Sequence, residues 1–397
     1  MAGFFTKEET QSDEFHKGKR IGCHRCTLYS ESREVSVGNF KKGILNVFEY
    51  AEGGITKWLK SEEGRSVASI YDSFGVDIVE DCLNICAVAC ANAFKQITEK
   101  EIINCRKTVF KLVKERQPKL INVFGSVSMR SIIGSRFSGA VGEFAKWQGW
   151  VIPDQDFKCW VAFIWAPHHI KVSNSSAVDN IWKRDIRVAL SHVDKAWLRD
   201  KKPNIEIIED LSVLANIKSR LVSVDYETTG IKPHAPGHRV ICASVADTPD
   251  HCFAFMMPTS KRGRIRFLNL MWSEHIQKMA HNLKFEEAWT VNRLRQPVRG
   301  WYWDSMLAAH ILDNRPGVTG LKFQTYVNFG IVDYSSEISP YLQSEGKSAN
   351  ELNTINELVD TFGGREKLLR YCGNDTIYQY RLALKQMELM KYDDLPF

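Results

Sequence analysis

The sequence predicts two α/β domains joined by a short linker. The chain has 397 residues, which exceeds the usual size of one hydrophobic core. Short apolar runs alternate with helical patterns, and a charged segment interrupts them near residue 200. We expect a flexible N-terminus over 1–22, a first domain over 23–198, a linker over 199–217 and a second domain over 218–397.

In the first domain, three apolar runs predict buried strands, at residues 44–48, 119–123 and 159–165. A helical pattern over 69–74 lies between the first two strands. This alternation of strand and helix indicates an α/β domain.

The second domain opens with three short strands, at residues 221–226, 239–246 and 252–257. The turn-rich pieces between them predict an antiparallel meander. Helical patterns then dominate, with one further strand at 277–280 and a closing helix at 367–389. We therefore expect a mixed sheet in this domain.

Composition excludes some classes of protein but does not choose a function. No run approaches the ~20 apolar residues of a membrane span, and the N-terminus lacks the basic start and apolar core of a signal peptide. We therefore expect a cytoplasmic protein with no membrane partner. The 53 Lys and Arg residues against 47 Asp and Glu residues give a net charge of +6, a mild bias towards polyanionic partners.

Carboxylates lie at suggestive positions in the second domain. Asp225 and Glu227 are two residues apart near a predicted strand end, so both side chains point the same way and can reach one cation. Glu286 stands at the start of a predicted helix. Tyr371 lies one helical turn before Asp375, so the phenol and this carboxylate share a helix face. Paired carboxylates with divalent cations suit phosphoryl chemistry, in which the ions activate water and stabilise the leaving oxygen.

These residues lie in three segments, VDYETTG at 224–230, AHNLKFE at 280–286 and YCGND at 371–375. In this order and spacing, the three segments closely resemble the proofreading exonuclease domain of family A DNA polymerases. That domain is ribonuclease H-like and belongs to the DEDD group. The resemblance covers about residues 218 to 397 and implies a two-metal site with Mg²⁺ or Mn²⁺. The implied metal ligands are Asp225, Glu227, Glu286 and Asp375, with Tyr371 orienting the attacking water.

The resemblance is not complete. The tyrosine subtype is indicated, because the histidine subtype would need His where Arg370 stands. The family usually has Asp where this chain has Glu286, whose extra methylene changes the reach towards the second ion. Asp304 is a competing ligand candidate, for which we favour a structural role.

Three residues near these motifs are candidate substrate contacts. Thr228 follows the first pair of carboxylates, and Asn282 and Lys284 precede Glu286. Asn282 and Lys284 could equally cap or solvate the start of the helix, and the sequence leaves both interpretations open.

The first domain contains an early C-x-x-C pair, Cys23 and Cys26, followed by Cys90 and Cys105. Two-residue spacing lets both thiolates bind one metal centre, and two more ligands complete a tetrahedral zinc site or an iron–sulfur cluster. Without a secretion signal, ten cysteines are expected as thiols or metal ligands rather than disulfides.

The first domain resembles the iron–sulfur (family 4-like) uracil-DNA glycosylases. The resemblance lies in the cysteine pattern, the early apolar strand and the segments at 83–85 and 101–105. The resemblance implies a 4Fe-4S cluster, with Zn²⁺ as the alternative metal. The implied ligands are Cys23, Cys26, Cys90 and Cys105, and Cys82 or Cys86 could replace one of them. Asn84 matches the asparagine that reads uracil and is a further candidate substrate contact.

Several glycosylase groups are missing. The family's Gly-Glu-Ala-Pro-Gly loop reads FEYAE at 48–52, and residues 66–68 lack the aromatic ring that would stack on a flipped base. Ala166 stands in place of the motif histidine. We therefore expect an inactive glycosylase domain, retained for DNA binding or docking, in which the cluster holds the fold.

The two domains together resemble the N-terminal part of certain bacteriophage polymerases, although this chain stops at Phe397 before any polymerase domain. We expect a 3′-5′ DNA exonuclease that releases nucleoside monophosphates from single-stranded or frayed 3′ ends. It would act in trans with a separately encoded DNA polymerase in a host bacterial cytoplasm. The alternatives are a bifunctional glycosylase and exonuclease for repair, a non-catalytic DNA-binding subunit of a polymerase, an RNA-trimming nuclease, and a truncated polymerase.

Overall fold

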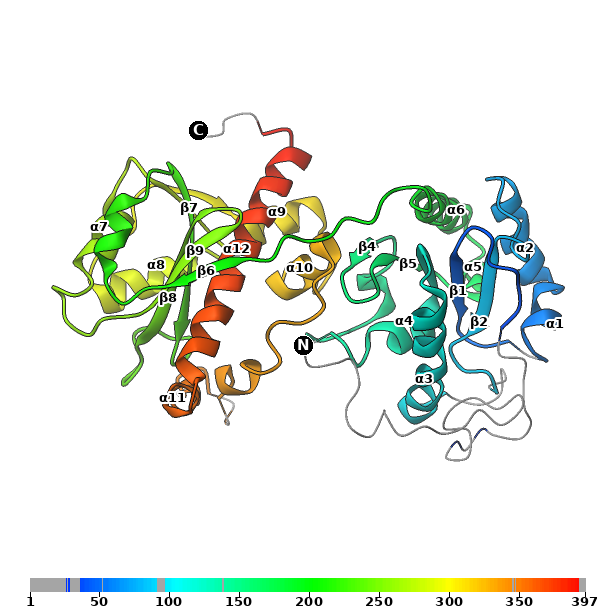
Figure 1. Ribbon diagram of the computed structural model, residues 1–397, viewed down its shortest axis with the longest axis horizontal. Helices are drawn as coiled ribbons and strands as arrows, with labels where there is room; N and C mark the ends of the chain where they lie inside the picture. The colour runs from blue at the N-terminus through cyan, green and yellow to red at the C-terminus, as the bar shows by residue number, and fades with distance from the viewer. Residues whose placement is uncertain are drawn as a thin grey trace. The chain divides into compact units, whose positions relative to one another are not determined.

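The computed structural model describes residues 26, 28, 36–51, 53–90, 97–137, 139–344, 346 and 348–392. The chain divides into two compact units, residues Met1–Arg199 and Asp200–Phe397, each with its own sheet (Figure 1). The predicted flexible N-terminus and Cys23 lie outside the described residues. Within the described part, no helix is both long and apolar enough to cross a lipid bilayer.

The first unit is built on a five-stranded sheet in the order β2-β1-β3-β5-β4. Neighbouring strands run parallel except β4, which is antiparallel to β5. Continuous apolar runs form these strands because helices cover the parallel sheet. The strands are β1 (Ile44–Phe48), β2 (Cys82–Cys86), β3 (Leu120–Phe124), β4 (Val151–Asp154) and β5 (Cys159–Ile164).

Short helices and two long ones complete this unit. The core includes Tyr71 of α2, Trp182 of α6 and the strand residue Phe124, all buried. The helical elements are α1 (Ile55–Leu59), α2 (Glu62–Asp72), α3 (Glu99–Arg116), α4 (Gly125–Ile133), η2 (Phe144–Lys146), α5 (Pro167–Ser173) and α6 (Ser176–Leu190).

A ladder of buried asparagines crosses the middle of this sheet. Asn46 of β1 pairs in register with Asn84 of β2 and Asn122 of β3. Asn46 donates to the Oδ1 atom of Asn84 over 2.9 Å, and Asn122 donates to the Oδ1 atom of Asn46 over 3.0 Å. The Tyr71 hydroxyl also donates to Asn46. Buried amides need such partners, so the ladder explains three polar residues in apolar strands.

The second unit has a six-stranded sheet in the order β11-β10-β7-β8-β9-β6. An antiparallel meander, β7-β8-β9, is extended by β10 and β11, which run parallel to β7. This is the ribonuclease H-like arrangement. The strands are β6 (Asn204–Ile207), β7 (Leu221–Thr228), β8 (Val240–Thr248), β9 (His251–Met256), β10 (Gln277–Ala280) and β11 (Trp301–Asp304).

The closing helix α12 (Gly364–Leu389) packs across β7, β8 and β9 (Figure 1). Its buried residues join two apolar clusters with the sheet. The other helical elements are η3 (Leu211–Asn216), α7 (Ile265–Trp272), α8 (Lys284–Trp289), η4 (Thr290–Leu294), α9 (Ser305–Leu312), α10 (Leu321–Phe329), η5 (Ser339–Leu342) and α11 (Ile355–Asp360).

The α/β prediction is confirmed, with two mixed sheets. One segment differs from expectation: residues 204–207, which we placed within the linker, form β6 and pair with β9. The pairing explains the difference, because β6 is a short edge strand whose order depends on its neighbour rather than on its own apolar content.

Candidate active site

Two acidic side chains lie together on the central strand β7. This strand pairs with β8 on one side and β10 on the other. Asp225 and Glu227 flank Tyr226, so they share one face of the sheet while Tyr226 faces the opposite core and contacts Phe267. Glu227 is 7% exposed, and Asp225 is partly exposed. The strand therefore presents both carboxylates to the same space.

Helix α12 brings Tyr371 and Asp375 to that face, both 7% exposed. Between them in the sequence, the buried Cys372 thiol lies 3.6 Å from the Oδ2 atom of Asp225. Donor atoms of Asp225, Glu227 and Cys372 lie within 4.8 Å of one another, and the described residues contain no other such group of His, Cys, Asp and Glu side chains. No sequence motif had singled out Cys372.

Glu286 lies in the first turn of α8 and is 2% exposed. Its Oε2 atom is buried and has no hydrogen-bond partner among the described residues. The negative charge of Asp225 contributes to the raised pKa of Glu286, so the two carboxylates are electrostatic neighbours. Burying a hydrogen-bond acceptor without a partner costs free energy, unless a cation or a hydrogen-bond donor binds to it.

Asp375 is the one carboxylate of the four with a cationic partner in the described structure. Lys322, in the first turn of α10, forms an ion pair with its Oδ1 atom. The Tyr334 hydroxyl donates to the same oxygen over 2.5 Å. The sequence analysis assigned no role to either Lys322 or Tyr334.

Electrostatics set these carboxylates apart from ordinary surface acids. Burial, followed by the negative charge of Asp375, raises the pKa of Asp225 to about 8. Burial, and then the charge of Asp225, raise the pKa of Glu227 and of Glu286 well above the usual range. The charge of Lys322 opposes the rise at Asp225 and Glu227. An added positive charge would therefore favour the ionised forms of these three acids.

This arrangement fits divalent cations. Carboxylate oxygens are the ligands that Mg²⁺ and Mn²⁺ prefer. The cluster contains carboxylate oxygens from β7, α8 and α12. The Oε2 atom of Glu286, which has no hydrogen-bond partner among the described residues, is available as a metal ligand. Bound cations would also offset the repulsion between the buried carboxylates.

The Asp304 carboxylate accepts hydrogen bonds from the backbone. It accepts hydrogen bonds from the N–H groups of Met306 and Leu307, where it caps α9. It also accepts from the N–H groups of Asn282 and Leu283, over 3.0 and 3.1 Å. These bonds give Asp304 the structural role that we favoured, because they join β11 to the loop before α8, the helix that carries Glu286.

The candidate substrate contacts have different surroundings. The Thr228 hydroxyl donates to the carbonyl oxygen of Gly230 over 2.7 Å, within its own turn. Asn282 has a positive φ of 73°, and its buried Oδ1 atom has no partner among the described residues. Lys284 is exposed at the start of α8. Asn282 and Lys284 thus lie just before Glu286 in the chain. Of the three candidate side chains, only the Thr228 hydroxyl is already hydrogen-bonded within its own turn.

Residues 204–390 match the family described as 3′-5′ exonuclease. These residues form a 3′-5′ exonuclease domain. The match spans the β7 carboxylates, the loop before α8 and the closing helix, so the predicted exonuclease resemblance of this half of the chain is confirmed. A search of curated proteins found no match.

Among solved structures, the exonuclease domain is similar to NrnC of Brucella melitensis, in a structure with bound Mg²⁺. The identity is 15%, over 49% of this chain and 85% of NrnC, with a TM-score of 0.32. It is also similar to Escherichia coli RNase D, described as an exoribonuclease involved in structured RNA processing, at 14% identity over 48% of this chain and 46% of RNase D, with a TM-score of 0.34.

The cysteines proposed from the sequence as cluster ligands lie upstream of the exonuclease domain. Cys23 is outside the described residues, Cys26 and Cys90 are half-buried, and Cys105 is buried in α3. The two possible substitutes, Cys82 and Cys86, lie in β2 within the core of the first unit. Burial raises the pKa of the Cys82 thiol to about 12, which opposes metal binding as a thiolate.

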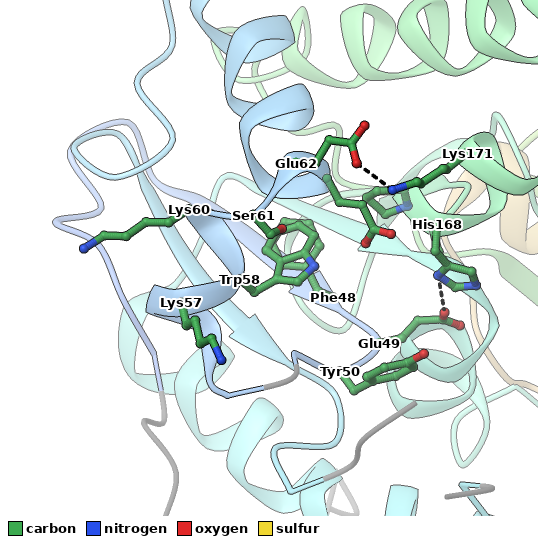
Figure 2. Close-up of a pocket in the computed structure, with 13 residues that line it drawn as sticks. Phe48, Glu49, Tyr50, Lys57, Trp58, Lys60, Ser61, Glu62, His168 and Lys171 are labelled. Carbon is green, nitrogen blue, oxygen red and sulfur yellow. Dashed lines mark hydrogen bonds and ion pairs between the residues drawn. The ribbon is translucent and has the colours of Figure 1, made fainter. Parts of the chain in front are cut away.

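The first unit also contains a cavity of about 560 Å³, shown in Figure 2. Glu49 lies at its wall, where the carboxylate accepts hydrogen bonds from the backbone N–H of Val127 and the hydroxyl of Ser126. The Nδ1 atom of His168 lies 3.7 Å from its other oxygen. Trp58 contributes an aromatic face, so the cavity combines an acid, an imidazole and a large ring (Figure 2).

Two sequence motifs can be located against this cavity. Ala166, which replaces the motif histidine, lines it, and His168 two residues later provides an imidazole there. Asn84 does not line it: both hydrogens of its side-chain amide are used by the carbonyl oxygens of Val37 and Ile78. The substrate contact that we expected for Asn84 would require these buried bonds to break.

Proposed function

We propose that the exonuclease domain is a two-metal-ion DNA exonuclease of the tyrosine subtype, which removes nucleotides from single-stranded or frayed 3′ ends. The observation that carries the proposal is the convergence of Asp225 and Glu227 on one face of β7, with Glu286 as the electrostatic neighbour of Asp225, while none of the three forms an ion pair within the described residues. With Asp375, they would hold two Mg²⁺ or Mn²⁺ ions. When bound, these ions would activate the attacking water and stabilise the leaving oxygen.

The chain's own residues position the reactants. Burial, and then the charge of Asp375, raise the pKa of Tyr371 well above the usual range, so the phenol keeps its proton. Tyr371 can therefore orient the attacking water by hydrogen bonding but cannot remove its proton at neutral pH. Asn282 and Lys284, beside Glu286, would contact the terminal nucleotide. The water oxygen loses a proton and bonds to phosphorus, the bond from phosphorus to the 3′ oxygen breaks, and that oxygen takes up one proton, so that one water is consumed for each nucleoside monophosphate released.

A product analysis tests this proposal. The full chain is incubated with Mg²⁺ and single-stranded DNA or RNA of the same sequence, and products are separated by chromatography. We expect nucleoside 5′-monophosphates from DNA at a higher rate than from RNA, and none with chelator. Faster release from RNA would favour the RNA-trimming alternative, and release of longer fragments would exclude exonuclease action.

We further propose that a separately encoded DNA polymerase is the partner, with this chain removing its misincorporated nucleotides. The proposal is supported by the resemblance of residues 218–397 to polymerase proofreading domains. Co-purification of the full chain with a polymerase expressed beside it, and faster removal of mismatched than of matched 3′ ends, are the expected results. A polymerase that neither binds the chain nor changes its mismatch preference would contradict this partnership.

For the first domain, we propose a 4Fe-4S cluster held by Cys23, Cys26, Cys90 and Cys105, with Zn²⁺ as the alternative. The burial of Cys82 and Cys86 in the core supports Cys90 as the third ligand. Metal analysis of protein purified without oxygen tests this: we expect iron and acid-labile sulfide, both lowered by Cys105→Ser. Zinc alone would favour the alternative, and neither metal would exclude both.

One observation supports a second activity, removal of uracil from DNA, despite the missing motif residues. Glu49, His168 and Trp58 line the same cavity, so an imidazole and an aromatic ring occur there from positions other than the family's own. Uracil release from a labelled single strand tests the proposal. Release by the full chain and its loss in Glu49→Gln would support this activity, whereas no release by either protein would support the inactive domain, retained for DNA binding or docking, that the sequence predicts.

A further inference from the structure

The first unit contains another cavity, of about 1030 Å³, at the opposite edge of its sheet from Glu49. Lys119, immediately before β3, and Lys158, immediately before β5, both line it. Glu49 instead follows β1, which runs parallel to β3. Because parallel strands begin at one edge of a sheet and end at the other, the length of β3, about 16 Å for its five residues, separates the two cavities.

The lining of this cavity, which we call the basic cavity, has an excess of positive charge. Its four lysines are Lys114, Lys119, Lys158 and Lys195. All four are exposed, and the last three form no salt bridge with another described residue. The acids of the lining are Asp156 and Asp194, and Asp156 already pairs with Arg136 over 3.1 Å. The basic cavity therefore favours an anionic ligand.

Aromatic rings form much of the remaining lining, from Phe110, Phe157, Trp160 and Trp197. The Phe157 ring is held between Phe110, 5.5 Å away and nearly perpendicular to it, and the guanidinium of Arg136, 3.7 Å from the ring centroid. The Trp160 indole N–H donates to the carbonyl oxygen of Lys195 over 3.2 Å. These contacts fix the wall in advance, which lowers the cost of ordering it when a ligand binds.

Lysines beside aromatic rings match the chemistry of single-stranded nucleic acid. Its phosphates pair with cations, and its unpaired bases stack on aromatic side chains. An inorganic anion would use only the lysines, and an apolar ligand only the rings. The volume lies at the upper end of the range for small-molecule pockets, about 300–1,000 Å³, and the lysines are exposed. These features suit a segment of a longer strand better than one nucleotide.

We propose that the basic cavity binds an internal segment of single-stranded DNA, with its lysines at the phosphates and its rings against the bases. The inference goes beyond the proposed function, because this site lies in the first unit and needs neither a 3′ end nor a metal ion. Only the choice of DNA over RNA rests on the proposed exonuclease activity.

Fluorescence anisotropy of a closed circle of oligothymidylate with an internal dye tests the proposal on the full chain. The circle has no 3′ end for the exonuclease domain, and chelator prevents degradation. In the Lys119→Gln, Lys195→Gln double variant, the slope of log binding constant against log salt should become shallower by about 1.4. Each phosphate contact on a single strand contributes roughly 0.7 to that slope.

Trp197→Ala tests the aromatic part of the lining. Loss of one stacked base should weaken binding at least ~5-fold and leave the salt slope unchanged, because stacking is worth about 1 kcal/mol or more. Trp197→Phe keeps a ring and should recover most of the affinity. Thermal melting checks that each variant is folded.

The matched control for charge is the Lys100→Gln, Lys183→Gln double variant. It removes the same charge from two exposed positions of the first unit that do not line the basic cavity. Its affinity and salt slope should remain those of wild type. An unchanged slope in the Lys119 and Lys195 variant, or an equal change in the control, would overturn the proposal.

Competitors separate the other possible ligands. Thymidine monophosphate that displaces the circle at the same concentration as an oligonucleotide would identify a nucleotide pocket. Polyglutamate that displaces it at equal charge would identify a site for an acidic protein, and tighter binding of a circle of RNA would identify RNA as the ligand. Each of these results would overturn the proposal. Because binding is measured without metal or turnover, none of them bears on the exonuclease activity, whose failure would leave the binding result intact.

Discussion

The Cys372 thiol lies 3.6 Å from the Oδ2 atom of Asp225 and links the closing helix to the central strand of the exonuclease domain. The sulfur is also 3.1 Å from the hydroxyl oxygen of Ser244 on β8. Cys372 is fully buried, and burial raises its pKa well above the usual range, so it remains a neutral thiol. This contact sets the position of α12, which carries Tyr371 and Asp375, against the two carboxylates of β7.

Cys372→Ala tests the importance of that contact. We expect a loss of about 1–2 kcal/mol in the free energy of unfolding and a fall of roughly 10-fold in kcat, since small shifts of catalytic groups are costly. Cys252→Ala is the matched control, because this buried thiol also contacts α12, 3.6 Å from the carbonyl oxygen of Gly373, but not Asp225. The control should lose stability and keep kcat. Equal kcat losses would contradict a specific role for the contact.

The raised pKa values predict how stability depends on pH. The pKa of Asp225 rises from its ordinary value of 3.8 to about 8 in the folded chain, and those of Glu227 and Glu286 rise in the same direction. At pH values between the ordinary pKa and the raised pKa of these groups, the folded state binds more protons than the unfolded state. Stability of the metal-free protein should therefore fall as pH rises through this window.

Thermal melting measures this dependence with and without Mg²⁺. Because ligands must lose their protons to bind a metal, the increase in Tm on adding Mg²⁺ should be larger at pH 8 than at pH 6. In the Asp225→Asn, Glu227→Gln double variant, stability should fall much less as pH rises, and Mg²⁺ should raise Tm much less. A metal-induced increase that is independent of pH would show that these carboxylates are not the ligands.

Tyr371→Phe removes the hydroxyl and keeps the ring beside Lys322. If the hydroxyl orients the attacking water, kcat should fall by up to ~100-fold while Mn²⁺ affinity and Tm change little. Steady-state cleavage of single-stranded DNA and Mn²⁺ titration measure the two effects. A variant with normal kcat would remove Tyr371 from the catalytic machinery.

Asp304→Ala separates a structural acid from a metal ligand. Its carboxylate accepts from four backbone N–H groups, so the alanine variant should lose about 2 kcal/mol or more of stability. Asp304→Asn keeps an acceptor oxygen and should recover part of that loss. Mn²⁺ stoichiometry should remain that of wild type in both. A variant that loses one bound ion would instead identify Asp304 as a ligand.

Much of the exonuclease domain could be predicted from local sequence patterns. The meander β7-β8-β9, strand β10 and helix α12 all lie within a few residues of the expected segments. Their apolar periodicity and turn residues are local signals. β6 was missed because its sequence is short and mostly exposed, and its order comes from pairing with β9.

The site was predictable only in part. The carboxylates and Tyr371 belong to recognisable motifs, but the contacts of Asp375 with Lys322 and Tyr334 join residues 53 and 41 positions apart. No local pattern specifies such contacts. In the first domain a usable signal was overlooked: Asn46, Asn84 and Asn122 each interrupt an apolar strand near its middle, which predicts a buried ladder rather than a substrate contact.

In the proposed function, Asp225 and Glu227 are essential for metal-dependent removal of nucleotides from 3′ ends. The most direct measurement is digestion of 5′-labelled single-stranded DNA by the full chain in Mg²⁺ or Mn²⁺, compared with the Asp225→Ala, Glu227→Ala double variant. We expect a ladder that shortens from the 3′ end with wild type and a rate at least ~100-fold lower with the variant. Equal degradation by the two proteins, or none by the wild type, would contradict the proposed function.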